Sequence, residues 1–227
     1  METPMPVIVL ASPKGGAGKT TCSALLAAGF ARRGITVTFF DLDPNRALSI
    51  WASHGLPENV TDGGNPGPAE VVRAIRNADR DGHIVVVDLE GMASRIVSRA
   101  ISQADLVIVP MQPTALDSAI GSGALTLIQE EEEALGRDIR HAVVLTRTSA
   151  IKSRVQRDLE TQLETLGIDV IQPPLMQRAA FGEIFTYGKD LETMVTRSEI
   201  TTAGNIDKAV ENARHFVEAV YDRIAAE

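Results

Sequence analysis

An apolar run, a glycine-rich turn and a long helical pattern follow one another without interruption over residues 6–33. The run PVIVLAS (6–12) has the density of a buried strand, and residues 19–33 have the spacing of a helix. Between them, Gly15, Gly16 and Gly18 let backbone N–H groups turn inward toward an anion. The positive end of the helix points at the same place. This strand–loop–helix unit predicts a phosphate site at the start of an α/β fold.

The rest of the chain repeats the alternation of apolar runs and helical patterns. Dense Val and Ile runs with little alternation are typical of parallel strands that are covered on both faces. We therefore predict one domain over residues 1–227: a mainly parallel twisted sheet flanked by helices. The further strands are expected at 35–43, 83–90, 105–111, 141–146 and 167–172, and the further helices at 45–54, 69–79, 94–103, 115–135, 151–165 and 203–226.

Composition restricts the cellular compartment and the kind of binding surface that we expect for this chain. Cys22 is the single cysteine, so no internal disulfide can form, and a reducing cytosol is the simplest location. No apolar run is long enough to span a bilayer, and we expect no signal peptide. The net charge of −8 argues against a wholly basic surface but allows a local basic patch.

The last helical pattern carries apolar residues on one face, which predicts a helix packed on the domain. Its other face mixes acids and bases and is slightly acidic, whereas a membrane-surface helix is expected to be basic there. We therefore favour a packing helix over a membrane anchor and expect no stable membrane association. The apolar residues are Ile206, Val210, Ala213, Val217, Val220 and Ile224.

The turn departs from the usual phosphate-loop pattern at two positions. Pro13 stands where the first glycine belongs, and Lys14 adds a second lysine before the glycines. The remaining pattern is intact: Lys19 is placed to reach the β- and γ-phosphates, and the Thr20 hydroxyl to reach Mg²⁺. A turn without a ligand would explain the glycines but not the Lys-Thr pair. The predicted phosphate contacts are Lys14, Gly15, Gly16, Ala17, Gly18, Lys19, Thr20 and Thr21.

Three acids follow apolar strands, where the carboxyl edge of the sheet should bring them to the phosphates. Asp41 and Asp43 come after VTFF, and Asp88 comes after IVVV. A carboxylate in this position commonly holds Mg²⁺ or its waters in phosphate-loop NTPases. The alternative is helix capping, above all for Asp43 before the next helix.

Together these residues resemble the ParA/MinD group of deviant Walker-A ATPases, and most closely the small ParA-type partition ATPases and VirC1-like proteins. The resemblance covers most of the chain in the family's order. The first two of its motifs are highly specific to the group. The motifs are KGGAGKTT (14–21), FFDLDPNRALSIW (39–51), VVVDLEG (85–91), DLVIVPMQPTALD (105–117) and PPLMQRAAFGEIFTYG (173–188).

The resemblance assigns roles to the site residues. It implies that Lys14 contacts the ATP of a partner subunit, that Lys19 serves the ATP of its own subunit, and that Asp43 positions the attacking water. It also implies that Asp41 and Asp88 support Mg²⁺ through water. Adenine contacts would come from Arg147 and Thr148 and from the loop holding Pro173, Pro174 and Leu175.

Two positions, Asn45 and Glu90, depart from the family pattern near the expected catalytic centre. No separate arginine finger or base is evident in the sequence. We therefore expect slow hydrolysis of ATP.

Nonspecific DNA is the partner that the resemblance implies for an ATP-bound homodimer. The best local basic run is TRTSAIKSRVQRD (146–158), and Lys and Arg side chains there would give salt-sensitive phosphate contacts. The alternative is an ordinary solvated helix. The candidate DNA contacts are Lys152, Arg154, Arg157 and Arg178, with Lys189 and Arg197 as extensions.

Several functions remain compatible with these residues. The first is a ParA-type ATPase that segregates or positions cargo with a ParB-like or cargo-adaptor protein, cytoplasmic and nucleoid-associated when ATP is bound. The second is a VirC1-like adaptor that recruits conjugative transfer components. A MinD-like membrane-cycling regulator is disfavoured by the last helix, and a small-molecule kinase or synthetase by the absence of a substrate-pocket signature.

Overall fold

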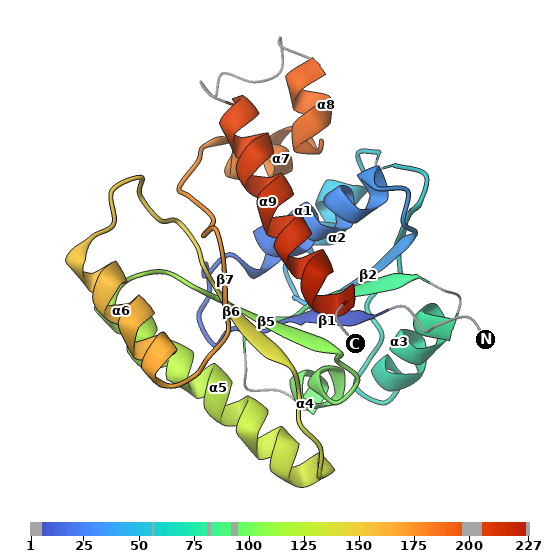
Figure 1. The fold of residues 1–227 in the computed structure, drawn as a ribbon. Coiled ribbons are helices and arrows are strands. Elements are labelled where there is room, and N and C mark those ends of the chain that lie inside the picture. The colour runs from blue at the N-terminus through green and yellow to red at the C-terminus, as the bar shows by residue number, and fades with distance from the viewer. Residues whose placement is uncertain (1–5, 56, 81–82, 92–94, 197–205, 226–227) are drawn as a thin grey trace.

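A computed structural model describes residues 6–55, 57–80, 83–91, 95–196 and 206–225, and its centre is one twisted sheet (Figure 1). Every pairing between its strands is parallel, in the order β3-β2-β4-β1-β5-β6-β7. β1 therefore lies in the middle, with strands from later in the chain on both sides. The strands are β1 (Val7–Leu10), β2 (Val37–Asp41), β3 (Val60–Asp62), β4 (Ile84–Asp88), β5 (Leu106–Met111), β6 (His141–Leu145) and β7 (Val170–Ile171).

Helices cover both faces of the sheet (Figure 1). On one face lie α1 (Lys19–Arg32), α2 (Ala47–Ala52), α7 (Ala180–Tyr187), α8 (Leu191–Thr196) and α9 (Ile206–Ala225). On the other lie α3 (Val71–Arg80), α4 (Arg95–Ile101), α5 (Ala115–Leu135) and α6 (Arg154–Thr165). This double covering is the reason that the strands are apolar on both sides, since Ile8 and Leu10 of β1 enter one core and Val7 and Val9 the other.

The predicted sheet and its covering helices are confirmed, and the differences are local. β3 was not predicted, and neither were α7 and α8. The helix expected from residue 151 begins at Arg154, because the Ser153 hydroxyl accepts a hydrogen bond from the Gln156 N–H and caps it. The strand expected over 167–172 is only the two residues of β7.

The last helix packs on the domain, as its apolar face predicts. Val210, Val217 and Val220 of α9 are buried, and α9 lies against α1 and α8. α1 and α9 approach so closely that a Cβ atom added to Gly29 would stand 2.5 Å from a Val217 methyl carbon. None of the described helices is both long and apolar enough to cross a membrane.

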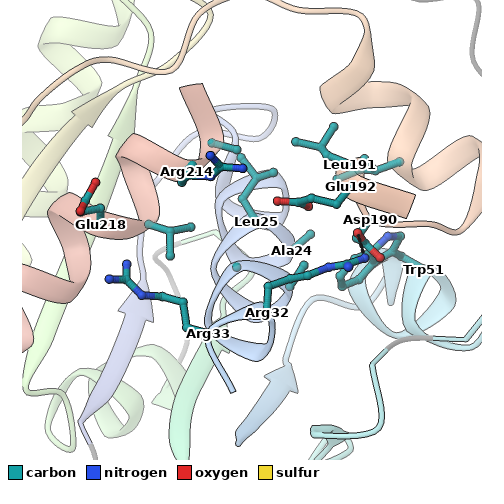
Figure 2. A pocket seen from close by; sticks show the side chains of 15 residues that line it. Ala24, Leu25, Arg32, Arg33, Trp51, Asp190, Leu191, Glu192, Arg214 and Glu218 are labelled. Carbon is teal, nitrogen blue, oxygen red and sulfur yellow. Dashed lines mark hydrogen bonds and ion pairs between the residues drawn. The ribbon is translucent and has the colours of Figure 1, made fainter. Parts of the chain in front are cut away.

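A cavity of about 350 Å³, the α1 cavity, lies over the middle of α1 between α8 and α9 (Figure 2). Its floor is apolar and includes Ala24 and Leu25, and Figure 2 shows Arg32 reaching past this floor toward Asp190. The Arg32 guanidinium donates to the Asp190 carboxylate over 2.6 Å. Burial raises the pKa of Asp190, but hydrogen bonds from Thr193 and Arg32 outweigh it and hold the pKa below its ordinary value. This ion pair ties the end of α1 to the start of α8.

Candidate phosphate and metal site

The loop between β1 and α1 has the open shape that its glycines predict. Gly16 and Gly18 have φ angles of 77° and 105°, in the left-handed region where a side chain is strained. Gly15 has ordinary φ, and a Cβ atom added to it would meet nothing within 4 Å. The backbone therefore requires glycine at positions 16 and 18, whereas neither the φ angle nor a described neighbour requires it at position 15.

Two side chains from other strands hold this loop in place. The Gln112 amide, just after β5, donates to the Gly16 carbonyl over 2.8 Å, and the Thr146 hydroxyl, just after β6, donates to the Ala17 carbonyl over 2.8 Å. Sequence reasoning missed both residues. The signal was the same as that for Asp88, namely a polar residue directly after an apolar strand.

Lys19 lies inside the loop at the first position of α1. Its side chain is buried, and its ammonium donates to the carbonyls of Ser12, at 3.2 Å, and Lys14, at 3.3 Å. Burial lowers the pKa of Lys19, while the nearby Asp88 and Asp43 carboxylates raise it. Lys14 lies on the same loop and is half-buried. The structure thus brings Lys19 near two of the three predicted acids, Asp43 and Asp88, and the cross-subunit role of Lys14 stays a prediction.

Asp88 is the most unusual carboxylate among the described residues. It is 0% exposed, and neither of its oxygens has a hydrogen-bond partner there. Burial raises its pKa to about 7; Asp41 adds to the shift, while Thr20, Lys19 and Ser23 oppose it. The Thr20 and Ser23 hydroxyls are close enough to lower this pKa, although neither makes a hydrogen bond to Asp88 in the structure. An unpaired buried carboxylate is costly, so a cationic ligand is a good physical reason for its presence.

The oxygen donors around Asp88 fit Mg²⁺, which shares its coordination with phosphate and water, better than a metal ion whose ligands all come from protein side chains. Asp88 and Thr20 supply oxygen atoms, which Mg²⁺ prefers. Among the described residues, no three His, Cys, Asp or Glu side chains are grouped as a metal site. Mg²⁺ commonly takes only one or two protein oxygens and completes its shell with phosphate and water.

Asp41 and Asp43 occupy the turn between β2 and α2, and they differ in how they are bound. Both oxygens of the buried Asp41 accept backbone N–H groups, from Asp43 at 3.2 Å and from Ser49 at 2.9 Å. Asp43 accepts the Asn45 N–H over 2.8 Å. The alternative in which Asp43 caps α2 is wrong, because Arg46 occupies the capping position and Asp41 binds the first helical turn.

A second cavity, the base cavity, lies beside the phosphate loop and has a volume of about 470 Å³. Of the residues predicted to contact adenine, Arg147 and Leu175 line this cavity, whereas Thr148, Pro173 and Pro174 are not among its lining residues. Pro174 instead accepts a hydrogen bond from the Asn212 amide on its carbonyl. The cavity is lined by Gly18, Thr21, Cys22, Thr146, Arg147, Leu175, Met176, Gln177, Arg178, Ala179, Phe181, Gly182 and Phe185.

Arg178 also lines the base cavity, away from the role that the sequence suggested. Its Nε atom is buried and has no hydrogen-bond partner among the described residues, and its Nη2 atom lies 3.3 Å from the Met176 sulfur. We expected Arg178 in a DNA-binding surface. The structure places it beside the phosphate loop, where a buried unsatisfied donor fits a ligand contact.

The predicted DNA-binding run (146–158) covers the loop before α6 and the first residues of α6, and three of its cations have partners within the run or on α6. Lys152 pairs with Glu160 at 2.7 Å, Arg154 with Asp158 at 3.7 Å, and Arg157 donates to the Lys152 carbonyl over 2.9 Å. Lys189, offered as an extension, donates to the His54 carbonyl. Arg197 lies outside the described residues.

Comparisons with known proteins agree with this geometry. The VirC1 protein family model matches residues 5–226. "Protein ParA" of Rhizobium radiobacter is 47% identical over 97% of this chain and 98% of its own length. "Maintenance of carboxysome distribution protein A" of Halothiobacillus neapolitanus is 28% identical, covering 77% of this chain and 81% of its own.

A solved structure shows the same fold at low sequence identity. The septum site-determining protein MinD of Pyrococcus horikoshii, complexed with Mg-ADP, superposes with a TM-score of 0.74 at 16% identity, over 98% of each chain. The chain therefore belongs to the VirC1 protein family, within the ParA/MinD group of phosphate-loop proteins.

Proposed function

We propose that this chain is a Mg²⁺-dependent ATPase of the ParA type that positions cargo. In this proposal, ATP joins two subunits into a dimer that binds nonspecific DNA, and hydrolysis separates them. The observation that carries it is the meeting of Lys19, Thr20 and the unpaired, buried Asp88 at one open glycine loop.

Each of these residues has a distinct part in the proposed reaction. The backbone N–H groups of residues 14–18 and the Lys19 ammonium bind the phosphates. Thr20 and Asp88 hold Mg²⁺, which neutralises negative charge on the phosphate oxygens. Asp43 orients the attacking water, and Asp41 holds the turn that carries Asp43. Arg147 and Arg178 line the space for the base.

The relatives support positioning of cargo as the role of this ATPase. One is named ParA and another is named for maintenance of carboxysome distribution. Neither name specifies what this chain carries. A ParB-like or cargo-adaptor protein is the partner class that we infer.

A VirC1-like adaptor that recruits conjugative transfer components is the second candidate. Two observations favour it over a DNA-bound switch: the family model matches VirC1 across the described domain, and Lys152 and Arg154 are already paired with acids. In that case ATP would still set the assembly state, but the dimer would bind a protein.

The experiment that separates the two measures size and DNA retention of the same sample with ADP, ATP and a non-hydrolysable ATP analogue. A cargo-positioning switch dimerises with ATP and is retained on DNA of any sequence, with retention falling as salt rises. A dimer without DNA retention supports the adaptor. If ATP is not hydrolysed and produces no dimer, the ATPase proposal itself is wrong.

A further inference from the structure

Arg46 lies just after Asp43 and has a backbone conformation that residues with side chains rarely adopt. Its φ and ψ are 52° and 32°, in the left-handed region. A non-glycine residue there costs on the order of 1 kcal/mol. Among the described residues, Arg46 and Arg147 are the only non-glycine residues with a positive φ angle. Both lie in loops that follow strands, at the edge of the sheet that carries the phosphate loop. Such strain persists only where the surrounding contacts fix it.

The Arg46 side chain supplies those contacts by folding back over its own loop. Its guanidinium donates to the Ser49 hydroxyl over 2.8 Å and to the Asp41 carbonyl over 3.4 Å. The same group lies 3.6 Å from the carboxylate of Asp62, at the end of β3. One half-buried cation therefore joins the ends of two strands to the first turn of α2.

Asp41 completes this arrangement from inside the sheet. Its carboxylate binds the N–H groups of Asp43 and Ser49, while its carbonyl accepts from Arg46. The Arg46 N–H in turn donates to the Asp43 carbonyl over 3.0 Å. Ser49 is thus held by both Asp41 and Arg46, and the segment that carries Asp43 is fixed at both of its ends.

We infer that Arg46 is a positioning residue for ATP hydrolysis, acting through the backbone that carries Asp43 and without contacting ATP. The inference rests on the proposed ATPase function. A water-orienting carboxylate must be held within a fraction of an ångström, because small misplacements lower the rate by as much as about a hundredfold. The strained Arg46 backbone and its guanidinium contacts meet this need, because they add side-chain contacts to a turn that is otherwise held by the Asp41 carboxylate and by local hydrogen bonds of Asp43.

The test replaces Arg46 by glycine, which adopts this φ without strain, so the fold is kept while the guanidinium is lost. We expect Arg46→Gly to lower the rate constant of ATP hydrolysis about tenfold or more. Its affinity for a non-hydrolysable ATP analogue should change less than about threefold, and its melting temperature should not fall. Arg46→Lys, which keeps one donor group, should recover part of the rate. Arg73→Ala, which removes an exposed arginine beside Glu70 on α3, is the matched control and should behave as wild type.

The possible results separate this inference from the function on which it rests. A wild-type rate in Arg46→Gly overturns the inference and leaves the ATPase proposal standing. A lower rate accompanied by weaker analogue binding or a lower melting temperature shows a general structural role and also overturns it. If the wild-type chain hydrolyses no ATP, the proposed function fails first, and the inference fails with it.

Discussion

At the scale of single residues, Asp41 and Asp88 are two buried acids on neighbouring strands that differ in whether their carboxylates are hydrogen-bonded. They are directly paired in the register of β2 and β4, and both are 0% exposed. Asp41 has both oxygens satisfied by backbone N–H groups, whereas Asp88 has neither satisfied by a described residue. A satisfied buried carboxylate stabilises its surroundings, and an unsatisfied one destabilises the fold unless a ligand pairs with it.

This contrast predicts opposite effects of the same substitution. Asp88→Asn should raise the stability of the nucleotide-free protein by about 1–2 kcal/mol, because it removes an unpaired buried charge. It should also abolish the additional stabilisation by Mg²⁺ and ATP. Asp41→Asn is the matched control and should destabilise the protein. Thermal unfolding with and without Mg-ATP measures both effects; a destabilised Asp88→Asn that still responds to Mg-ATP would contradict the metal role.

The role proposed for Lys14 depends on a second subunit. Lys14→Ala should weaken ATP-driven dimerisation and hydrolysis at least tenfold, while nucleotide affinity of the monomer changes little, because Lys19 already serves the bound phosphates. Dimerisation is measured by sedimentation, hydrolysis by the turnover rate and nucleotide affinity by titration, all on one preparation. Equal loss of all three would show that Lys14 acts within its own subunit.

Site residues were predictable where a local pattern carried them. Lys19, Thr20, Asp43 and Asp88 stand at fixed places after strands, and the structure brings them together. Gln112 and Thr146 also directly follow strands, but they bind loop carbonyls 96 and 129 residues away in the chain, so their position after a strand does not show which groups they bind. Arg178 was predicted as a DNA contact, whereas its side chain lines the base cavity. A positive charge in a sequence does not say which way its side chain points.

At the scale of elements, the strands covered on both faces were the easiest to predict, because burial on both sides leaves runs of Val and Ile. β3 has only three residues, two of them exposed at the edge of the sheet, so it leaves no apolar run. α7 and α8 have eight and six residues and form because Phe181, Ile184, Leu191 and Met194 enter the core. Helices this short depend on tertiary packing, which a sequence window does not contain.

The close packing of α1 and α9 gives a prediction at this scale. Gly29→Ala should cost about 1–3 kcal/mol, because its new methyl group would stand 2.5 Å from the stiff, β-branched Val217. Gly123→Ala in α5 is the control; its new methyl group meets nothing within 4 Å, so it should stabilise by about 0.5–1 kcal/mol. Urea unfolding measures the change in the free energy of unfolding for both variants. An unchanged stability of Gly29→Ala would mean that α9 can move away from α1 at no cost.

At the scale of the whole molecule, a net charge of −8 means that DNA can be bound only by a local group of cations. The basic run (146–158) is weakened by neighbouring acids, since Glu160 accepts from both Lys152 and Gln156. DNA contact through Lys152 would therefore require it to exchange a carboxylate for a phosphate.

Glu160→Gln should make that exchange easier. It removes the negative charge beside Lys152, so ATP-dependent DNA retention should increase about threefold at low salt, and the difference should shrink as salt rises. Glu70→Gln, which alters a similar exposed pair with Arg73 on α3, should leave retention unchanged. Filter binding at two salt concentrations measures both. Equal retention in both variants would exclude Lys152 as a DNA contact.

The hydrogen bond from Thr146 to Ala17 also has a consequence for the order in which the molecule forms. It joins residues 129 positions apart, and β1, to which the loop belongs, pairs with β4 and β5, which are synthesised much later. Contacts of such long sequence separation form late, because the intervening chain must first be closed into a loop. On a ribosome the glycine loop would emerge early yet reach its final geometry only after β6 has been made. Nucleotide binding should therefore require the chain through β6, and fragments that end before residue 146 should bind none.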